Sequence, residues 1–343
     1  MKTLHICIER EKMKIAVISV TDAGGKIAAK LAEVFSLDLY SKNNCSFNLK
    51  SITEMVMSKY RKIVFISSTG IAVRAIAPFI ESKDRDPAVV VIDSSGKFAI
   101  SLLSGHLGGA NELTIKLADV LKAVPVITTA TDNMGIKAPD VLARDNDLVI
   151  DSLKDAKYLA ALLVKGEKVG FVDEDNLIDV PYGYSLQLGN VQGILCITHK
   201  KNLNMESVRT LKLVRKNIVL GIGCRKGFKP SDMIDKVVEL LEDNNIDERA
   251  IKYIATAEIK AQEKAVIELA QYFKCKVRIF SLEEIKSVQN NYKGSDFVEE
   301  SVGVRAVCEP CVELTGSDLV TGKIKSGGMT LCIGKLKYDK RMC

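Results

Sequence analysis

The stretch Lys62–Ser67, with the sequence KIVFIS, indicates the fold class of the chain. Its β-branched and aromatic residues precede the turn residues Ser68-Thr69-Gly70, as is typical of a buried strand. The apolar spacing over Ile71–Ile80 then predicts a helix, and Ala88–Asp93 predicts another strand. Because a helix connects two strands, this pattern favours an α/β domain with a parallel or mixed sheet.

The same alternation extends on both sides of this stretch. The remaining strands and helices predicted in the N-terminal part are Lys14–Val20, Gly25–Phe35, Phe98–Ser101, Ala110–Leu121 and Val124–Thr128. A middle stretch combines a helix at Leu153–Val164 and a strand at Lys168–Val172 with strand-like sequence over Pro181–Asn204. This stretch therefore predicts a connector domain whose sequence pattern differs from that of the parts on either side.

Alternation resumes in the last third of the chain. The predicted elements there are Asn217–Gly221, Ser231–Glu242, Tyr253–Thr256, Gln262–Phe273, Lys276–Phe280, Val302–Leu314 and Met329–Lys335. We therefore predict an N-terminal α/β domain at residues 1–145, a middle connector domain at 146–215 and a C-terminal α/β domain at 216–343.

Composition excludes several classes of protein. The chain has 343 residues, 47% apolar and 27% charged, which is ordinary for a globular protein of two or three domains. Its net charge of +6 comes from dispersed basic residues, and it contains no Trp, so nucleic acid is not an expected partner. No apolar run reaches the ~20 residues of a membrane span. The nine scattered cysteines and the lack of an export signal favour a reducing, cytoplasmic location.

The segment Ser104–Asn111, with the sequence SGHLGGAN, carries the strongest sign of chemistry. Glycines before a helix, here Gly105, Gly108 and Gly109, let backbone N–H groups converge on an anion. A histidine in such a loop, His106, serves as a general acid or base near neutral pH. The alternative is that the glycines only turn the chain and that His106 caps the helix.

Two further polar segments accompany predicted strand ends. Thr128–Asp132 offers hydroxyls and a carboxylate that suit ligand binding or the orientation of a histidine, or else cap the next helix. Arg74, expected in the first turn of its helix, suits a carboxylate ligand or a solvated face. Ligands in α/β sheets bind beyond the carboxyl ends of the strands. We expect Ser67–Gly70, Ser104–Gly109 and Thr128–Asp132 at that edge.

The C-terminal part holds two weaker motifs. Gly221–Gly227 resembles half of a dinucleotide fingerprint, but Lys226 stands where the third glycine belongs, and no Walker A loop is present. Its adjacent Arg225 and Lys226 favour an anionic ligand. Cys308 and Cys311 form a CxxC pair without a second pair of zinc ligands, so we interpret them as structural.

Taken together, these motifs resemble the cobalt-precorrin-5A hydrolase (CbiG) family of anaerobic cobalamin biosynthesis, over most of the chain. The resemblance rests on two ordered groups of residues, first Ser68–Gly70, Arg74–Pro78, Lys83–Val91, Ser101–Asn111 and Pro125–Asp132, then Gly221–Gly227, Ala255–Lys260 and Val302–Val304. The middle part, about residues 146–215, is similar to the family in its general sequence character but shares no specific motif with it. Lys226 stands where the family has Arg, Glu258 where it often has Asp, and Cys308 and Cys311 where relatives have small residues.

The resemblance implies a reaction. A δ-lactone on a cobalt-containing corrinoid is opened by water, and the methylated bridging carbon leaves as acetaldehyde. We assign His106 as the acid or base, Asp132 as the group that orients it, and the backbone of Gly105–Ala110 as oxyanion donors. Arg74, Arg225, Lys226 and Lys260 are assigned as clamps for substrate carboxylates. The remaining expected substrate-binding residues are Ser104, Gly105, Gly108, Gly109, Asn111, Thr129, Thr131, Gly221 and Gly223.

No nucleotide or added metal is implied, because the cobalt belongs to the substrate. The expected partner is a small corrinoid, with neither nucleic acid nor membrane; a homodimer and transient contact with neighbouring pathway enzymes remain open. Two other functions also remain open. One is a non-catalytic corrinoid- or anion-binding carrier, and the other is a nucleotide-binding regulator, for which the fingerprint is incomplete.

Overall fold

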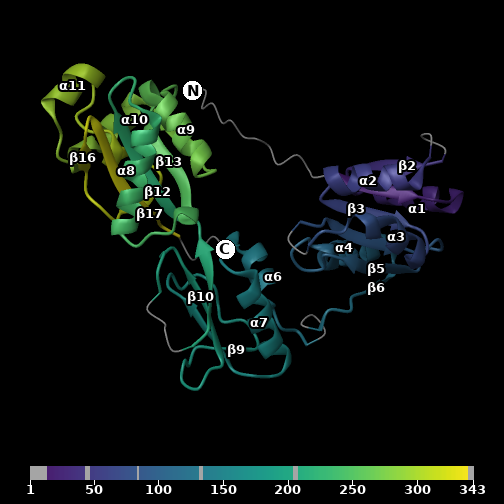
Figure 1. Cartoon of the computed structure of the whole chain (residues 1–343). Helices are drawn as coiled ribbons and strands as arrows, with labels where there is room; N and C mark the ends of the chain where they lie inside the picture. The colour runs from purple at the N-terminus through teal and green to yellow at the C-terminus, as the bar shows by residue number, and fades with distance from the viewer. Residues whose placement is uncertain (1–13, 43–46, 83–84, 131–133, 204–207, 339–343) are drawn as a thin grey trace. The chain divides into compact units, whose positions relative to one another are not determined.

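The structure is a computed structural model that describes residues 14–42, 47–82, 85–130, 134–203 and 208–338. The chain divides into two compact units, Met1–Val141 (unit 1) and Leu142–Cys343 (unit 2). Among the described residues, unit 1 holds one β-sheet and unit 2 holds two (Figure 1). The helices packed on these mixed sheets confirm the predicted α/β class, while the predicted boundaries near residues 145 and 215 stay predictions.

The sheet of unit 1 has the strand order β2-β1-β3-β4-β5-β6. Its strands are β1 (Ile15–Ser19), β2 (Leu37–Ser41), β3 (Lys62–Ile66), β4 (Ala88–Ile92), β5 (Phe98–Leu103) and β6 (Val124–Val126). The first four strands in this order pair in parallel, β5 runs antiparallel to β4, and β6 is parallel to β5. The sheet is therefore mixed.

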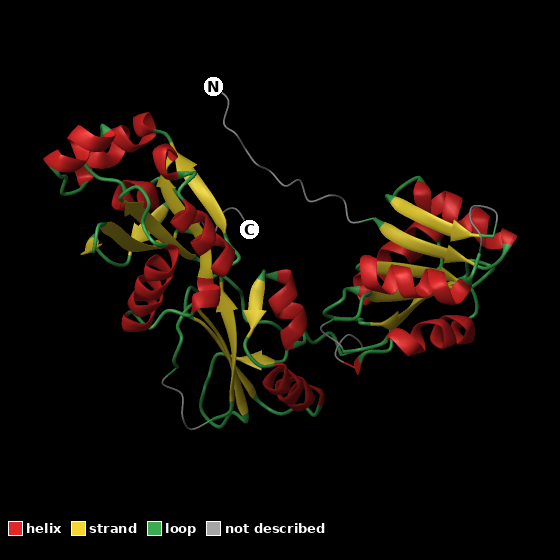
Figure 2. Cartoon of the chain, turned by 45° about the horizontal axis from the view of Figure 1, so that its top comes forward, coloured by secondary structure: helices red, strands yellow, loops and turns green. Residues whose placement is uncertain are grey.

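Helices cover both faces of this sheet (Figure 2). α1 (Asp22–Ala32) and α4 (Ala110–Leu121) lie on one face, while α2 (Leu49–Lys59) and α3 (Thr69–Ile76) lie on the other. Alternate residues of β3 point to opposite faces, so Val64 packs under α1 and α4 while Phe65 packs under α2 and α3. Because β3 is buried on both faces, its sequence is continuously apolar.

The direction of β5 decides where the polar loops lie. Leu103, at the carboxyl end of β5, pairs with Val89 near the start of β4. At the other end of β4, the Ser67 amide donates to the Ile92 carbonyl at 3.0 Å. The loops after β3 and β5 therefore lie at opposite edges of the sheet. The expectation that Ser67–Gly70 and Ser104–Gly109 share one ligand-binding edge is wrong, whereas the segment after β6 does follow the β5 loop, because β5 and β6 are parallel.

Unit 2 begins with a smaller sheet of order β7-β11-β10-β8-β9. Its elements are α6 (Pro139–Asp145), β7 (Leu148–Ile150), α7 (Leu153–Val164), β8 (Val169–Asp173), β9 (Tyr184–Ser185), β10 (Gly193–Thr198) and β11 (Thr210–Arg215). The division between the units falls within α6, whose first turn belongs to unit 1. Only β7 is antiparallel to its neighbour.

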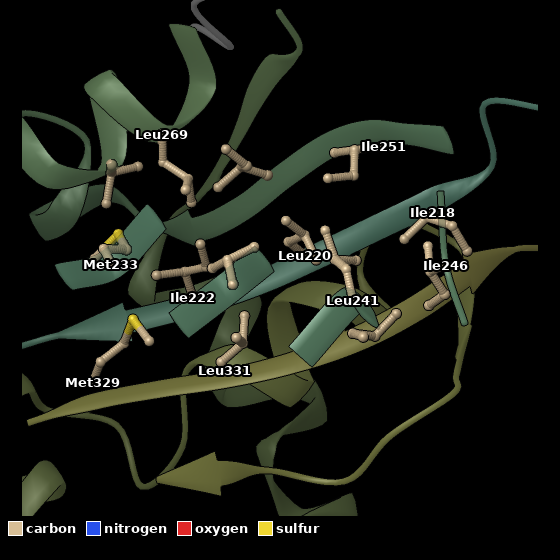
Figure 3. Packing of buried hydrophobic residues seen from close by; sticks show 14 of the residues in the cluster. Ile218, Leu220, Ile222, Met233, Leu241, Ile246, Ile251, Leu269, Met329 and Leu331 are labelled. Carbon is tan, nitrogen blue, oxygen red and sulfur yellow. The ribbon is translucent and has the colours of Figure 1, made fainter. Parts of the chain in front are cut away.

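The second sheet of unit 2 has the order β14-β13-β12-β17-β15, with β16 paired to β17. Its strands are β12 (Ile218–Cys224), β13 (Ile251–Ala257), β14 (Lys276–Phe280), β15 (Ser317–Leu319), β16 (Ile324–Ser326) and β17 (Met329–Leu336). The helices are α8 (Pro230–Asp243), α9 (Lys264–Tyr272), α10 (Leu282–Val288), α11 (Asp296–Val302) and α12 (Cys308–Glu313). Figure 3 shows Leu220 and Ile222 of β12 packing among Met233, Leu241 and Leu331.

Two predicted helices differ from the structure. The helix expected over Ile71–Ile80 ends at Ile76 and continues as a 3₁₀ turn at Ala77–Phe79, which contains Pro78. The helix expected over Val302–Leu314 is instead the end of α11, a glycine with φ of 81°, and the separate helix α12. Gly303 ends α11 because glycine adopts this left-handed conformation at no steric cost.

One buried ion pair links the two sheets of unit 2, and a second lies within the smaller sheet. The Lys212 ammonium on β11 donates to the Asp247 carboxylate, which precedes β13, at 2.9 Å. The Arg215 guanidinium on β11 donates to the Asp173 carboxylate on β8 at 2.8 Å. All four side chains are less than a tenth exposed. Buried ion pairs are costly to break, so the Lys212–Asp247 pair holds the two sheets in one arrangement. Over the described part of the chain, no helix has both the length and the apolar character needed to cross a membrane.

Candidate functional site

The loop Ser104–Gly109 is closed by its own backbone. The carbonyls of Ser104, Gly105 and His106 accept hydrogen bonds from the amides of Ala110, Asn111 and Gly109 at 3.0–3.1 Å. Ser104 has a φ of 55° and Gly109 a φ of 80°, both in the left-handed region. The loop is therefore a compact turn that delivers the chain into α4 at a fixed angle.

Close packing explains two of the loop glycines. A Cβ atom at Gly108 would lie 2.5 Å from Cβ of Ser104, and one at Gly105 would lie 2.7 Å from Oδ1 of Asn111. Neither position has room for a side chain. The Oγ atom of Ser104 is buried beneath this packing and has no hydrogen-bond partner among the described residues.

The same bonds limit the predicted anion site. Because the amides of Gly109 and Ala110 donate to carbonyls of the loop, they do not converge on a ligand as expected from the sequence. For these two residues the structure favours the alternative in which the glycines turn the chain. Oxyanion binding by the amides that precede Gly109 stays a prediction.

His106 lies against a carboxylate. Its Nδ1 atom is 3.4 Å from Oδ1 of Asp140, and the two side chains are only 17% and 20% exposed. Burial alone would raise the pKa of Asp140, but the hydrogen bond and charge attraction from His106 outweigh it, and the pKa lies below its ordinary value. Asp140 is therefore ionised at neutral pH and faces the imidazole.

Sequence reasoning missed Asp140. It follows Pro139 in the first turn of α6, a position where acidic residues are common for helix capping, so nothing local links it to a loop 34 residues earlier. Asp132, assigned from the sequence as the group that orients His106, lies outside the described residues together with Thr131. The assignments of Asp132 and Thr131 stay predictions.

Asn111 connects the His106 loop to the segment after β6. Its buried amide donates from Nδ2 to Oγ1 of Thr129 at 3.0 Å, and its Oδ1 accepts from Oγ of Ser101 at 2.6 Å. Asn111 is 7% exposed. The structure thus brings together His106, Ser104, Asn111 and Thr129 as predicted, and gives Asn111 a role in holding the edge together.

Arg74 lies elsewhere in unit 1. It is in the last turn of α3, not the first, and its side chain is exposed. A methyl group built on Gly70 would lie 3.5 Å from Nη1 of Arg74, so the guanidinium is beside the start of α3. That start follows β3, at the edge opposite the His106 loop. Arg74 and His106 are therefore not brought together at one sheet edge.

Gly221 and Gly223 lie inside β12 and not in a loop. A Cβ atom at Gly221 would lie 2.2 Å from the carbonyl oxygen of Cys308, and one at Gly223 would lie 2.7 Å from Oγ1 of Thr330. Close approach of α12 and β17 accounts for both glycines. Contact of these two residues with substrate stays a prediction.

The predicted cations of unit 2 surround the end of β12. Arg225 and Lys226 follow this strand and are exposed. Lys260 is half-buried and pairs with Glu263 at 3.2 Å, and Glu263 also accepts from the Gly227 amide at 3.2 Å. Burial alone would raise the pKa of Glu263. The hydrogen bonds from the Gly227 amide and Lys260 outweigh burial, so the pKa of Glu263 lies below its ordinary value. Lys260 is thus partly neutralised, and Arg225 and Lys226 are the stronger candidates for an anion.

Cys308 and Cys311 of α12 are fully buried with Cys332 of β17 in one apolar cluster. Burial raises the pKa of the Cys311 thiol well above its ordinary value. The hydrogen bond with Cys308, together with burial, raises the pKa of the Cys332 thiol. Within the described ranges, no group of three or more His, Cys, Asp or Glu side chains is arranged to hold a metal ion. The structural interpretation of this pair stays a prediction, and the packing agrees with it.

Three family models match successive parts of the chain. The model described as cobalamin synthesis G N-terminal matches residues 51–132, and the model of the cobalamin biosynthesis central region matches 137–213. The model described as cobalamin synthesis G C-terminus matches 218–334. His106 lies in the first matched segment and Asp140 in the second.

Two relatives match this chain over nearly its whole length. The cobalt-precorrin-5A hydrolase of Salmonella typhimurium is 32% identical over 93% of this chain and 97% of its own length. The protein of the same name from Priestia megaterium is 29% identical over 94% of this chain and 95% of its own. A solved cobalamin biosynthesis protein G homolog from Sulfolobus solfataricus is 23% identical, covers 95% of this chain and 98% of its own, and has a TM-score of 0.43.

Proposed function

Because the chain belongs to the cobalamin synthesis G (CbiG) family, we propose that it is a cobalt-precorrin-5A hydrolase of anaerobic cobalamin biosynthesis. The reaction opens the δ-lactone of cobalt-precorrin-5A and releases acetaldehyde, which gives cobalt-precorrin-5B. The observation that carries the proposal within this chain is the half-buried His106, held in a glycine loop against the ionised Asp140.

The chemistry consumes one water and needs no oxidant. The water gives a proton to the base as its oxygen bonds to the lactone carbonyl carbon, the ring C–O bond breaks, and the freed alkoxide takes a proton. Loss of a proton from that hydroxyl then lets the adjacent C–C bond break, which forms the carbonyl of acetaldehyde. The macrocycle carbon that keeps the electron pair takes a proton. Each step moves a proton, so one positioned base with a pKa near neutrality serves the whole sequence.

His106 supplies that base in the proposal. Imidazole has an ordinary pKa near 6.5, which suits proton transfer at pH 7. Gly105 precedes His106, and Gly108 and Gly109 follow Leu107, so the loop that holds the imidazole carries few side chains. Arg225 and Lys226 serve as partners for peripheral carboxylates of the corrinoid, with Lys260 in a lesser role. No nucleotide or added metal takes part, and the cobalt enters with the substrate.

Turnover by the purified full-length chain tests the proposal. Anaerobic incubation with cobalt-precorrin-5A should release acetaldehyde in step with substrate loss, and mass spectrometry should show a product that has gained water and lost acetaldehyde. His106→Ala should lower kcat by roughly 10²–10⁴ without unfolding the protein. Asp119→Asn, an exposed substitution on the adjoining helix α4, is the matched control and should keep full activity.

A non-catalytic corrinoid carrier is the competing function. It predicts stoichiometric binding of the substrate and no acetaldehyde from the purified protein. In that case His106→Ala would change the dissociation constant only. Binding without turnover, under conditions in which the Salmonella typhimurium relative turns over, would therefore exclude the hydrolase and support the carrier.

A further inference from the structure

The carboxylate that faces His106 comes from outside the matched N-terminal segment. That segment ends at residue 132, and Asp140 lies in the first turn of α6, still within unit 1. The residues around it, Ile136, Ala138 and Pro139, are buried. The start of α6 is therefore anchored by apolar contacts, so the carboxylate stands at a defined position.

Two contacts orient this carboxylate. Its Oδ1 atom accepts from the Val141 amide at 3.0 Å and lies 3.4 Å from Nδ1 of His106. An ionised carboxylate is only an acceptor, so it favours the ring tautomer that carries its hydrogen on Nδ1. In a neutral imidazole with hydrogen on Nδ1, the basic lone pair is on Nε2.

We propose that Asp140 is the positioning residue for His106: it holds the hydrogen on Nδ1 and makes Nε2 the nitrogen that takes and returns the proton during lactone opening. The inference rests on the proposed function for the identity of the reaction. The tautomer itself is a property of the free protein. Asp140 touches no reacting atom, and its contribution is orientation of the ring and stabilisation of the imidazolium that forms when Nε2 is protonated.

A comparable arrangement sets the expected size of the effect. In Ser-His-Asp hydrolases, replacing the orienting carboxylate by its amide keeps the geometry but yields the wrong tautomer and a large loss of kcat. Asp140 contacts Nδ1 at a longer distance, so we expect Asp140→Asn to lower kcat by about 10-fold to 100-fold, less than removal of the base itself. The KM should stay within about 3-fold, because the substitution removes no substrate contact.

Imidazole ¹⁵N NMR of the full-length chain without substrate reads the tautomer directly. The chain has three histidines, and the His106→Ala spectrum assigns the His106 signals by their loss. Wild-type His106 should show a protonated Nδ1 and an unprotonated Nε2 above its pKa. Asp140→Asn should shift hydrogen to Nε2 and lower the imidazole pKa, since the imidazolium loses its counter-charge. The acid limb of kcat/KM should then move to lower pH.

Matched variants separate positioning from folding. Asp140→Glu keeps a carboxylate and should recover the Nδ1 tautomer and more activity than Asp140→Asn. Asp145→Asn, at the end of the same helix, should change neither the tautomer nor kcat. If Asp140→Asn fails to fold by circular dichroism, Asp140→Ser provides the second uncharged variant, with the same expected shift.

An unchanged His106 tautomer and pKa in the folded Asp140 variants would overturn the proposal. So would a tautomer change caused by Asp132→Asn and not by Asp140→Asn. If the tautomer shifts as expected but the wild type releases no acetaldehyde, the positioning role of Asp140 is supported and the proposed reaction fails. The two proposals therefore fail by different measurements.

Discussion

Asn111 donates a hydrogen bond to Thr129 at 3.0 Å, although 18 residues separate them in the sequence. The bond ties the start of α4 to the segment after β6, at the edge where the His106 loop lies. Asn111 is buried, and this bond and the one from Ser101 are among those that satisfy its amide.

Asn111→Leu should therefore lower the free energy of unfolding by about 1–3 kcal/mol, because it removes the hydrogen bonds to the hydroxyls of Ser101 and Thr129 and crowds Gly105. Chemical denaturation measures the loss. Glu112→Leu, at the exposed neighbouring position, is the control and should stay within about 0.5 kcal/mol. A stability equal to that of the control would mean that the amide bonds contribute nothing.

Arg225 and Lys226 should contribute affinity and not rate. The carboxylates that they would bind do not change charge in the reaction, which is uniform binding. The double variant to Ala should raise KM several-fold at constant kcat, and added salt should weaken binding to the wild type in the same direction. Lys236→Ala with Lys264→Ala removes the same charge from exposed helix positions and should leave KM unchanged. A fall in kcat at constant KM in the Arg225 and Lys226 variant would contradict this assignment.

Cys308 and Cys311 should be replaceable by Ala without loss of activity or of bound metal, as measured by turnover and elemental analysis. Both are fully buried, so each substitution should cost about 1 kcal/mol of stability through the lost sulfur packing. Stoichiometric zinc in the wild type that disappears in the double variant would refute the structural interpretation.

Gly221→Ala should be far more damaging than Gly25→Ala. The added methyl group at Gly221 meets the Cys308 backbone at 2.2 Å, so α12 must shift, at a cost of about 1–3 kcal/mol or more. Gly25 lies within α1, and apart from its chain neighbours and the backbone of its own helix no described atom would lie within 4 Å of the new methyl, so Ala there should stabilise the protein by about 0.5–1 kcal/mol. Thermal melting of the two variants measures this difference. Equal melting temperatures would contradict the close packing of Gly221 against Cys308.

Asp247 should make unit 2 sensitive to acid. Burial alone would raise its pKa, but hydrogen bonds from Arg249 and Lys212 lower it to about 2, against 3.8 for the free side chain. A depressed folded-state pKa contributes stability above pH 3.8, and this is lost as the pH falls toward 2. The contribution to the free energy of unfolding at neutral pH is about 2 kcal/mol.

Denaturant unfolding between pH 7 and pH 2.5 measures the contribution of Asp247 to the free energy of unfolding, from the difference between the wild type and Asp247→Asn. The variant should be less stable than the wild type at pH 7, and its free energy of unfolding should fall less as the pH is lowered. Parallel pH curves for the two proteins would show that other carboxylates carry the acid sensitivity. Asp318→Asn, with an exposed ion pair, is the control and should follow the wild type.

Local sequence determined the elements whose pattern is complete within one segment. Ala110–Leu121, Leu153–Val164 and Lys276–Phe280 are predicted with the bounds that the structure has, because helical and strand periodicity are properties of neighbouring residues. The glycine loop with His106 and the order of the family motifs were also readable, since each is a short contiguous sequence.

Tertiary structure decided what depends on residues distant in the chain. Whether β5 runs with or against β4 is not encoded in the pattern of either strand, yet it places Arg74 and His106 at opposite edges. The partnership of His106 with Asp140 and the packing of Gly221 against Cys308 likewise join segments with no local signal in common. Periodicity reports which face of an element is buried, but only the assembled sheet determines which carboxylate or carbonyl lies opposite a given atom.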